Sequence, residues 1–292
     1  MKAASTPFKK KKKQSGVWLT LLPLYLFTLV FVAGPLVYMF VLSFQTRAEV
    51  WGVVNQFTLD NYKNIFQPVY LNTFVESFKL ALTSTLLICA IGYPFGYFMA
   101  KLSEGKKKLA MLFLMLPFWV NSLIRLYGWI IILQKKGLLN YILMKLGLIQ
   151  EPLKILYSYP AIVIGMVYVL LPFMALSVYS SAEKLDWSLI EAARDLGANS
   201  VQTFTKILLP LSVPGIISGI TMVFVPSLTT FVISDLLGGS KILLIGNVIE
   251  QEFKQGSNWH SGSGMSLVLM IFILISMALI AKYDKDGEGT TF

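Results

Sequence analysis

Six long runs of apolar residues alternate along the chain with more polar segments. A helix needs about 20 such residues to cross roughly 30 Å of hydrocarbon, and each run meets that length or comes close. Backbone groups in lipid must be paired within their own segment, so helices are the expected form. The predicted spans are Val17–Leu42, Phe78–Ala100, Leu109–Leu133, Ala161–Ser181, Val213–Leu237 and Gly264–Tyr283. The pattern predicts an all-α membrane protein with six transmembrane helices.

The first apolar run follows the basic segment Lys9–Lys13 and invites comparison with a secretory signal. It is about 26 residues long, however, and has no clear small-residue cleavage site. We therefore expect a retained transmembrane helix over 17–44, preceded by a basic cytoplasmic tail over 1–16. The lysines of this tail are interpreted as a topology anchor on anionic lipid.

Composition agrees with a membrane protein, since 55% of the residues are hydrophobic and only 14% are charged. The net charge of +10 does not indicate nucleic-acid binding, because the lysines gather at the ends of the apolar runs. With the N-terminus inside, the cytoplasmic segments and the adjoining Lys282 hold 15 of the 25 Lys and Arg residues, and the three outer loops hold 8. This asymmetry predicts that both termini are cytoplasmic. The tail 284–292, rich in glycine and charge, is expected to be disordered.

Few residues offer catalytic or metal-binding chemistry. The chain has one cysteine, Cys89, in an apolar run and one histidine, His260, in a polar loop. No disulfide framework or Cys/His metal cluster follows from these. The sequence also lacks the glycine-rich phosphate loop of ATPases and the motifs of serine hydrolases and zinc proteases. A membrane enzyme is thus the weaker of two function classes, the other being a transport subunit without its own ATPase.

The loop over 182–212 is unusually long and has a helical pattern. Ser188 followed by Glu191 fits a capping box, which predicts a helix start. Leu189, Ile190, Ala193 and Leu196 are expected to share an apolar face, with Glu191, Arg194 and Asp195 opposite.

Glycine and proline residues set the expected limits of this loop. Gly197 should end the first helix, because glycine accepts the left-handed conformation of a helix C-terminus. A second helical turn is expected from Asn199 or Ser200 to about Leu208, before Pro210 and Pro214 break the chain.

The same loop resembles a known motif. Glu191-Ala192-Ala193, three residues, Gly197, nine residues and Ile207-Leu208-Leu209-Pro210 match without gaps the EAA loop of type I ABC importer permeases. The resemblance implies a transmembrane domain over 74–281 in a bacterial plasma membrane. It also implies that Glu191, Ala192, Ala193, Gly197, Ile207 and Pro210 belong to a loop that docks on a cytoplasmic ATPase. The alternative is an amphipathic helix lying on the membrane surface.

The residue types suit a docking helix. Small side chains at Ala192 and Ala193 allow another surface to approach closely. Glu191 offers a charge near the helix N-terminus, where the helix dipole favours an anion.

Further strings resemble the first permease of spermidine/putrescine (polyamine) importers. They are Pro117–Gly128, Leu171–Met174, Ser234–Gly239 and Leu244–Asn247. The resemblance implies a second permease, a dimer of ATPase subunits that holds ATP and Mg, and an extracytoplasmic polyamine-binding protein. It implies no cofactor on this chain.

Arg125 lies about 16 residues into the third predicted span, or about 24 Å along a helix. A cation there should face a polar path or a partner, and Asp235 is the best-placed carboxylate. Three readings stay open: an Arg125–Asp235 pair, an arginine that reaches the outer headgroups, and direct substrate contact. An importer of sulfate or a carboxylate would use Arg125 as its ligand.

Other residues complete the candidate path. Asn121 and Tyr168 join Arg125 and Asp235 as path candidates. Tyr127, Trp129, Tyr168 and Phe173 offer aromatic faces to an ammonium group, or act as interfacial anchors. Close helix packing is expected at Gly92-xxx-Gly96 and Gly215-xxx-Gly219, and kinks at Pro94, Pro117 and Pro172.

Overall fold

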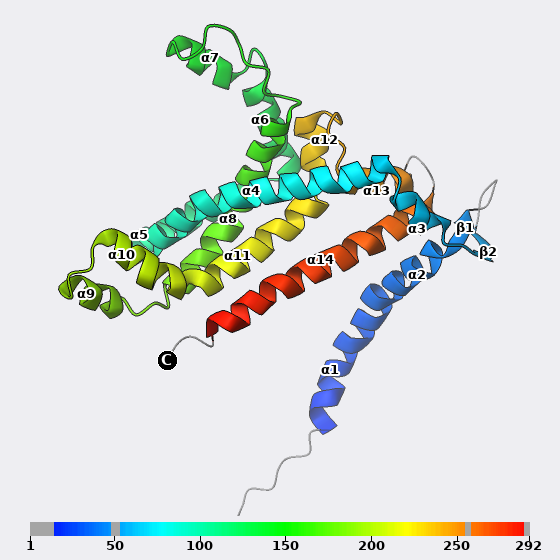
Figure 1. Cartoon of the computed structure of the whole chain (residues 1–292), viewed down its shortest axis with the longest axis horizontal. Helices are drawn as coiled ribbons and strands as arrows, with labels where there is room; N and C mark the ends of the chain where they lie inside the picture. The colour runs from blue at the N-terminus through cyan, green and yellow to red at the C-terminus, as the bar shows by residue number, and fades with distance from the viewer. Residues whose placement is uncertain (1–14, 48–52, 255–257, 289–292) are drawn as a thin grey trace, which may run out of the picture.

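The computed structural model describes residues 15–47, 53–254 and 258–288, so the predicted lysine anchor Lys9–Lys13 lies outside it. The described chain is helical apart from one small hairpin, in which β1 pairs with β2 in antiparallel fashion (Figure 1). The elements are α1 (Ser15–Thr28), η1 (Leu29–Ala33), α2 (Gly34–Ser43), β1 (Gln45–Arg47), β2 (Val53–Phe57), α3 (Asp60–Ile65), α4 (Pro68–Ala100), α5 (Glu104–Met115), η2 (Leu116–Trp119), α6 (Ser122–Leu133), α7 (Leu138–Lys145), α8 (Tyr159–Ala182), α9 (Ser188–Asp195), α10 (Ser200–Thr203), η3 (Phe204–Leu208), α11 (Leu209–Thr229), α12 (Val232–Gly238), α13 (Ile245–Lys254) and α14 (Trp259–Glu288).

The centre of the bundle is α8, which packs between α4 and α11. Its Ile162, Met166 and Met174 side chains are fully buried. Glycines on both neighbours allow the close approach that the sequence predicts. On α4, the Cα of Gly96 faces Val178 of α8 so closely that an added Cβ would lie 2.9 Å from the Val178 Cβ. Gly215 and Gly219 of α11 meet Ser181 and Met174 in the same way.

Five helices among the described residues are long and apolar enough to cross a membrane, and a bent pair raises the number to as many as six. The bent pair corrects the predicted third span, Leu109–Leu133. The chain bends by 93° between Trp119 and Ser122. Pro117 cannot donate a helix hydrogen bond, and the Asn121 side chain accepts the Leu123 N–H at 2.8 Å, so a new helix begins there.

The predicted fifth span, Val213–Leu237, also needs correction. Its helix ends at Thr229, Thr230 is extended, and α12 begins at Val232. The predicted break at Pro210 and Pro214 is wrong, because Ser200–Thr229 forms one helical span through both prolines.

A π-helical turn, with hydrogen bonds between residues five apart, lets the helix continue through Pro210. In η3 the Leu209 N–H bonds to Phe204 O, five residues back, directly before Pro210. The same arrangement precedes Pro35 in η1, where the Gly34 N–H bonds to Leu29 O. Such π-turns accommodate a proline within a continuing helix.

At the C-terminus, α14 runs to Glu288. The predicted disorder of the tail 284–292 is therefore wrong for residues 284–288, which continue the last span, and residues 289–292 lie outside the description.

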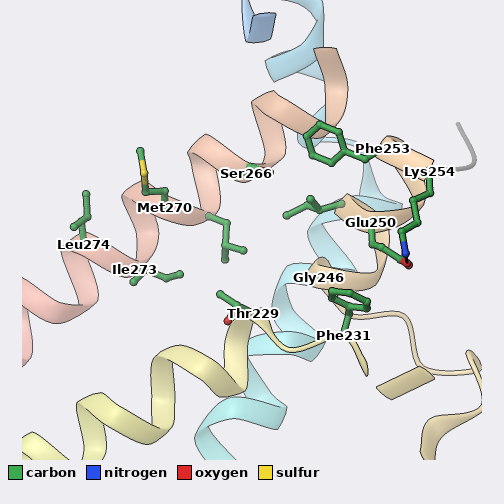
Figure 2. A pocket seen from close by; sticks show the side chains of 12 residues that line it. Thr229, Phe231, Gly246, Glu250, Phe253, Lys254, Ser266, Met270, Ile273 and Leu274 are labelled. Atoms are coloured by element: carbon green, nitrogen blue, oxygen red, sulfur yellow. Dashed lines mark hydrogen bonds and ion pairs between the residues drawn. The ribbon is translucent and has the colours of Figure 1, made fainter. Parts of the chain in front are cut away.

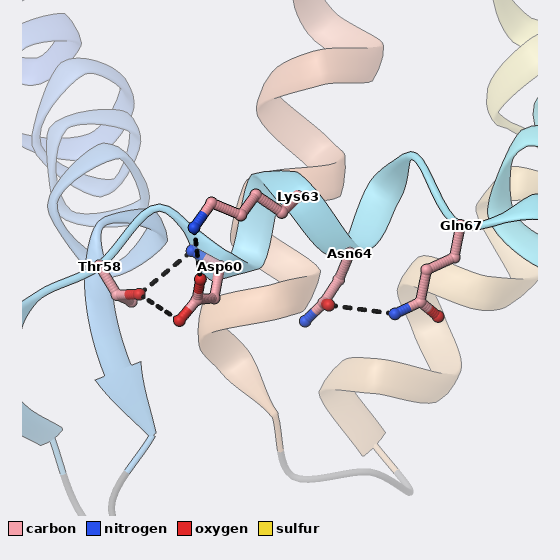
Figure 3. A network of polar contacts seen from close by, with 5 residues as sticks. All are labelled: Thr58, Asp60, Lys63, Asn64 and Gln67. Carbon is pink, nitrogen blue, oxygen red and sulfur yellow. Dashed lines mark hydrogen bonds and ion pairs between the residues drawn. The ribbon is translucent and has the colours of Figure 1, made fainter.

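Polar side chains organise α3, between the hairpin and α4. Thr58 and Lys63 both contact the carboxylate of Asp60, and Gln67 donates to Asn64 (Figure 3). The Asn61 amide donates to the carbonyls of Ser43 and Gln45 at 2.9 and 3.0 Å, which ties α3 to the end of α2.

Orientation in the membrane can be tested by labelling. Gln150 and Asn199 lie in the loops at opposite ends of α8, and Ser103 lies between α4 and α5; all three are exposed. In a chain with Cys89 replaced by alanine, an impermeant thiol reagent should label Gln150→Cys in intact cells. Ser103→Cys and Asn199→Cys should react only after permeabilisation. Labelling of Asn199→Cys in intact cells would contradict the proposed orientation.

Candidate functional site

The loop between α8 and α11 contains a short helix, α9, with a well-defined end. Gly197 has a φ of +84°, the left-handed conformation that the sequence predicts for it. The Gly197 N–H bonds to Arg194 O at 2.9 Å, and the Ala198 N–H bonds to Ala193 O at 3.0 Å. These two bonds form a Schellman motif, which satisfies carbonyls at the helix end. Gly197 therefore fixes where α9 stops and how the chain leaves it.

The start of α9 differs from the prediction. Trp187 is the N-cap, and the Ser188–Glu191 capping box does not form. Asp186 accepts the Ser188 N–H at 3.0 Å instead, and hydrogen bonds from the Ser188 side chain and backbone lower the pKa of Asp186. A capping box does occur one helix later. Asn199 and Gln202 bond reciprocally at the start of α10.

The apolar side chains of α9 lie on one side of the helix, as the sequence predicts, and this side is only partly buried. Ile190 and Ala193 are buried, whereas Leu189 is 47% exposed and Leu196 is 88% exposed. Of the two small residues of the motif, Ala192 is thus the one with an exposed side chain in this structure. Ala192 is exposed beside the outward leucines, Glu191 is exposed on the opposite side of α9, and Val201 of α10 is 70% exposed. We call the exposed face defined by Leu189, Ala192, Leu196 and Val201 the docking face, as the candidate surface for a partner.

The last motif residues lie where the loop joins α11. Ile207 is half-buried within η3. Pro210 is exposed at the second position of α11. These two residues shape the junction with the span, on the far side of η3 from α9.

Aromatic and basic side chains connect the loop to α4. The Trp187 and Tyr97 rings lie 5.8 Å apart, and the Lys101 ammonium lies 4.4 Å from the Tyr97 ring centre and 5.4 Å from that of Trp187. A cation over two rings favours this arrangement by cation–π attraction. The N-cap of α9 is thereby fixed to the end of the α4 span.

A second connection joins the loop to α5. Tyr179 donates to Glu183 at 2.6 Å, and this bond holds the pKa of the Glu183 carboxyl below its usual value. Lys107 of α5 pairs with the same carboxylate at 3.3 Å. Both connections lie at the base of the loop, so a displacement of α9 reaches α4 and α5 as well as α8.

Within the bundle, Arg125 on α6 lies against aromatic rings. Its guanidinium carbon is 5.3 Å from the ring centre of Phe118 and 5.7 Å from that of Tyr168. Its Nε is buried and has no hydrogen-bond partner. The structure thus brings two predicted path residues, Arg125 and Tyr168, together with Phe118. Asn121, four residues before Arg125, is exposed and caps α6.

Asp235 does not contact Arg125. Its carboxylate accepts a 2.6 Å hydrogen bond from the Asn247 amide of α13. Among the described residues, Arg125 forms no ion pair, so the predicted Arg125–Asp235 pair is wrong. The break after Thr229 places Asp235 on α12, which packs on α6 and α8 as well as α13, and the Asp235 carboxylate meets Asn247 of α13 instead of Arg125.

A groove of about 540 Å³ runs between α8 and α11. Its α8 wall includes Phe173, Ser177 and Ser180, whose spacing of four and three residues places them on one helix face, and Lys184 of the following turn also lines it. Ser218 of α11 faces them from the other wall. Hydroxyl groups along an intramembrane groove give a solute polar contacts, which lipid cannot provide. The sequence carried this signal, since the serines recur at helical spacing, but no motif marks it.

A second groove, of about 520 Å³, lies between α13, α14 and the end of α11 (Figure 2). Its charged residues, Glu250 and Lys254, pair with each other at 2.7 Å. The α14 wall is mainly apolar, with Met270, Ile273 and Leu274. This groove suits hydrocarbon, so the α8–α11 groove is the better candidate for a polar solute.

The helical bundle, the broken span and the helical loop together define a membrane-spanning subunit. Residues 92–285 match the model of the family described as binding-protein-dependent transport system inner membrane component, and the chain belongs to this family. It is therefore a multi-pass permease of an ATP-binding-cassette importer, a transport subunit in an inner membrane. Family membership implies an ATPase, a binding protein and a second permease as partners.

Several curated relatives are similar along most of their length. The spermidine/putrescine transport system permease protein PotB of Escherichia coli K12 is 48% identical over 229 residues, 78% of this chain and 83% of the relative. PotB of Haemophilus influenzae is 40% identical over 267 residues, 91% of this chain and 93% of the relative. The inner membrane ABC transporter permease protein YdcU of E. coli is 30% identical over 91% of this chain and 89% of the relative.

A solved structure supports the fold. A chain in the crystal structure of a bacterial alginate ABC transporter, in complex with an alginate pentasaccharide-bound periplasmic protein, matches with a TM-score of 0.75. The match covers 92% of this chain and 93% of that chain at 17% identity. At this identity the likeness shows the fold alone.

Proposed function

We propose that this permease forms half of the translocation path of a polyamine importer, with spermidine and putrescine as the cargo class. The observation that carries the proposal is the 40–48% identity, over 78–91% of the chain, to permeases named for spermidine and putrescine transport. The binding-protein partner is then an extracytoplasmic polyamine-binding protein. ATP and Mg belong to the partner ATPase, and this chain binds no cofactor.

The coupling role is assigned to the loop 182–212. Glu191 and Ala192 belong to the surface that meets the ATPase, together with the exposed Leu189 and Leu196. Ala193 supports the loop from inside, and Gly197 sets its exit. Ile207 and Pro210 join the loop to α11. The exposed leucines favour a protein partner, because a large apolar surface at a helix end is typical of an interface.

One observation favours a second candidate. Arg125 is an intramembrane cation without a carboxylate partner in the described part of the chain, as an importer of sulfate or a carboxylate would require. The two candidates make opposite predictions about which solute drives the transporter.

Stimulated ATP hydrolysis separates the candidates. The permease should be co-expressed with its second permease, ATPase and binding protein and reconstituted in lipid. Binding protein offered with spermidine or putrescine should raise the ATPase rate several-fold, and sulfate should leave it unchanged. A complex that responds to sulfate or a carboxylate, and ignores both polyamines, contradicts the polyamine assignment.

A further inference from the structure

Four aromatic rings form two edge-to-face pairs beside Arg125, and one ring of each pair contacts its guanidinium. Phe118 and Phe173 have ring centres 5.5 Å apart at 84°, and Trp129 and Tyr168 have centres 5.5 Å apart at 65°. The guanidinium lies over one ring of each pair. We call Phe118, Trp129, Tyr168 and Phe173 the aromatic box.

The contacts of Arg125 show what this box can hold. A cation at membrane depth usually finds a carboxylate, yet the guanidinium here lies over ring faces, and its buried Nε has no hydrogen-bond partner. Cation–π attraction grows when the cation is desolvated, as in this half-buried position. Ring faces attract positive charge without regard to its covalent source. A site that holds guanidinium in this way also suits an alkylammonium group.

Arg125 and the two α8 rings of the box belong to different helical segments, and a bend in the chain precedes the segment that carries Arg125. Phe118 precedes the 93° bend, and Arg125 and Trp129 follow it on α6. Tyr168 and Phe173 belong to α8, the central helix of the bundle. Val120 has an extended backbone conformation, and Asn121, with a φ of −52° and a ψ of 134°, is also outside the helical region. A change of backbone angles at these two residues moves Arg125 and Trp129 relative to Tyr168, and it also moves the buried Leu126 and Leu133 of α6.

The box also adjoins the polar groove. Phe173, one of its rings, lines the α8–α11 groove together with Ser177 and Ser180. A cation that leaves the box therefore meets hydroxyl groups next. This continuity connects the box to a polar route along α8.

We propose that the aromatic box binds an ammonium group of the cargo, and that Arg125 occupies the box when no cargo is present. Movement of α6 withdraws Arg125, the cargo ammonium takes its place over the rings, and Arg125 returns after the cargo has passed. The identity of the cargo rests on the proposed polyamine function. The existence of a cation site that Arg125 fills does not.

Thermal unfolding of the assembled transporter tests the site directly. Arg125→Ala should lower the unfolding midpoint, and millimolar methylguanidinium should raise it again by about 2 °C, because a ligand that binds the folded state stabilises it. Methylurea, similar in shape but uncharged, should have no effect. Spermidine and putrescine should act as methylguanidinium does. The wild-type complex should not respond to methylguanidinium, because Arg125 already fills its box.

Ring removal provides the matched comparison. The double variant Arg125→Ala/Tyr168→Leu should lose the response to methylguanidinium. Arg125→Ala/Tyr141→Leu should keep it, because Tyr141 is a 62% exposed ring on α7, outside the box. If the alanine variants fail to assemble, Arg125→Gln, which keeps the length without the charge, takes their place.

Each contrary result has a distinct meaning. If methylurea raises the unfolding midpoint as much as methylguanidinium does, the box is not a cation site. If the response to methylguanidinium survives Tyr168→Leu, the box is again not the cation site, and Arg125 instead faces a carboxylate of the second permease. A response to methylguanidinium but to neither polyamine overturns the cargo role. Failure of the proposed function is recognised separately, because polyamines would then not stimulate the wild-type ATPase.

Discussion

Replacing Gly197 by valine should abolish coupled uptake while the permease still inserts and assembles with its second half. Gly197 has a φ of +84°, and a Cβ at this position would meet open space. The cost is therefore in the backbone, about 1–3 kcal/mol for a β-branched residue in the left-handed region. The chain escapes this strain by giving up the bonds to Arg194 O and Ala193 O, which displaces the docking face. Uptake should fall at least about tenfold, the equivalent of about 1.4 kcal/mol, and co-purification of the ATPase on the same preparation shows whether docking is lost.

The chain contains a matched control for backbone strain. Gly147, after α7, has a φ of +71° and open space around its Cβ position. It has the same bonding pattern, with the Gly147 N–H on Met144 O and the Leu148 N–H on Leu143 O. Gly147→Val should therefore strain the chain equally at the opposite end of α8 and leave ATPase binding intact. Equal loss of ATPase binding in both variants would mean that strain anywhere destabilises the subunit.

Charge reversal at Glu191 tests the polar side of α9 for contact with the ATPase without altering the fold. Glu191 is exposed and takes no part in a capping box, so Glu191→Lys should cost α9 only about 0.3–1 kcal/mol through the helix dipole. Weaker ATPase binding by this variant would therefore report on the interface. If Glu191→Lys and Gly197→Val both bind the ATPase and import at the wild-type rate, the loop is a surface helix.

Hydrophobicity alone located the spans, because the membrane imposes a length on every crossing segment. It did not reveal the bend after Trp119. The apolar run continues through Pro117 and Asn121, so its hydropathy is uninterrupted, whereas the backbone is not. The opposite error occurred at Pro210, where a π-turn keeps α11 continuous. Proline marks a constraint on the backbone, and the surrounding turns decide whether the helix breaks.

Local chemistry predicted the end of α9 better than its start. Only glycine adopts a φ of +84° without strain, so Gly197 had one plausible role. At the start of α9, either Asp186 or Ser188 can accept a hydrogen bond from a backbone N–H with its side chain. In the structure Asp186 does so, from the Ser188 N–H. Asn199 and Gln202 carry the signal of a capping box, but the sequence does not rank this box above Ser188 and Glu191.

Long-range partners were the least predictable part of the site. Asp235 and Arg125 look complementary when both are assigned to continuous spans. Their actual neighbours, Asn247 and the ring of Phe118, depend on breaks that redirect α12 and α6. An ion pair can be proposed from sequence because its two residues have opposite charges. Aromatic contacts carry no such signal. The sequence thus supplied Trp129, Tyr168 and Phe173 of the aromatic box but not Phe118, and it did not show which of these rings meet.

Substituting alanine for Gly96 should have the largest effect on stability, although it adds a single methyl group. The new Cβ would overlap the backbone carbonyl oxygen of Ala175 and lie 2.9 Å from the Val178 Cβ and 3.0 Å from the Tyr179 nitrogen. Two of these three neighbours are backbone atoms of the central helix, so α4 must move away from α8. Overpacking of this kind costs about 1–3 kcal/mol.

The same substitution at Gly105, in the first turn of α5, gives the comparison. A Cβ there meets nothing within 4 Å, and alanine favours helix, so Gly105→Ala should be neutral or slightly stabilising. Thermal unfolding of the two purified variants in the same detergent measures the difference, with Gly96→Ala unfolding at the lower temperature. If Gly96→Ala unfolds at the wild-type temperature, α4 and α8 are not packed through this glycine. The central position of α8 beside α4 would then have to be abandoned.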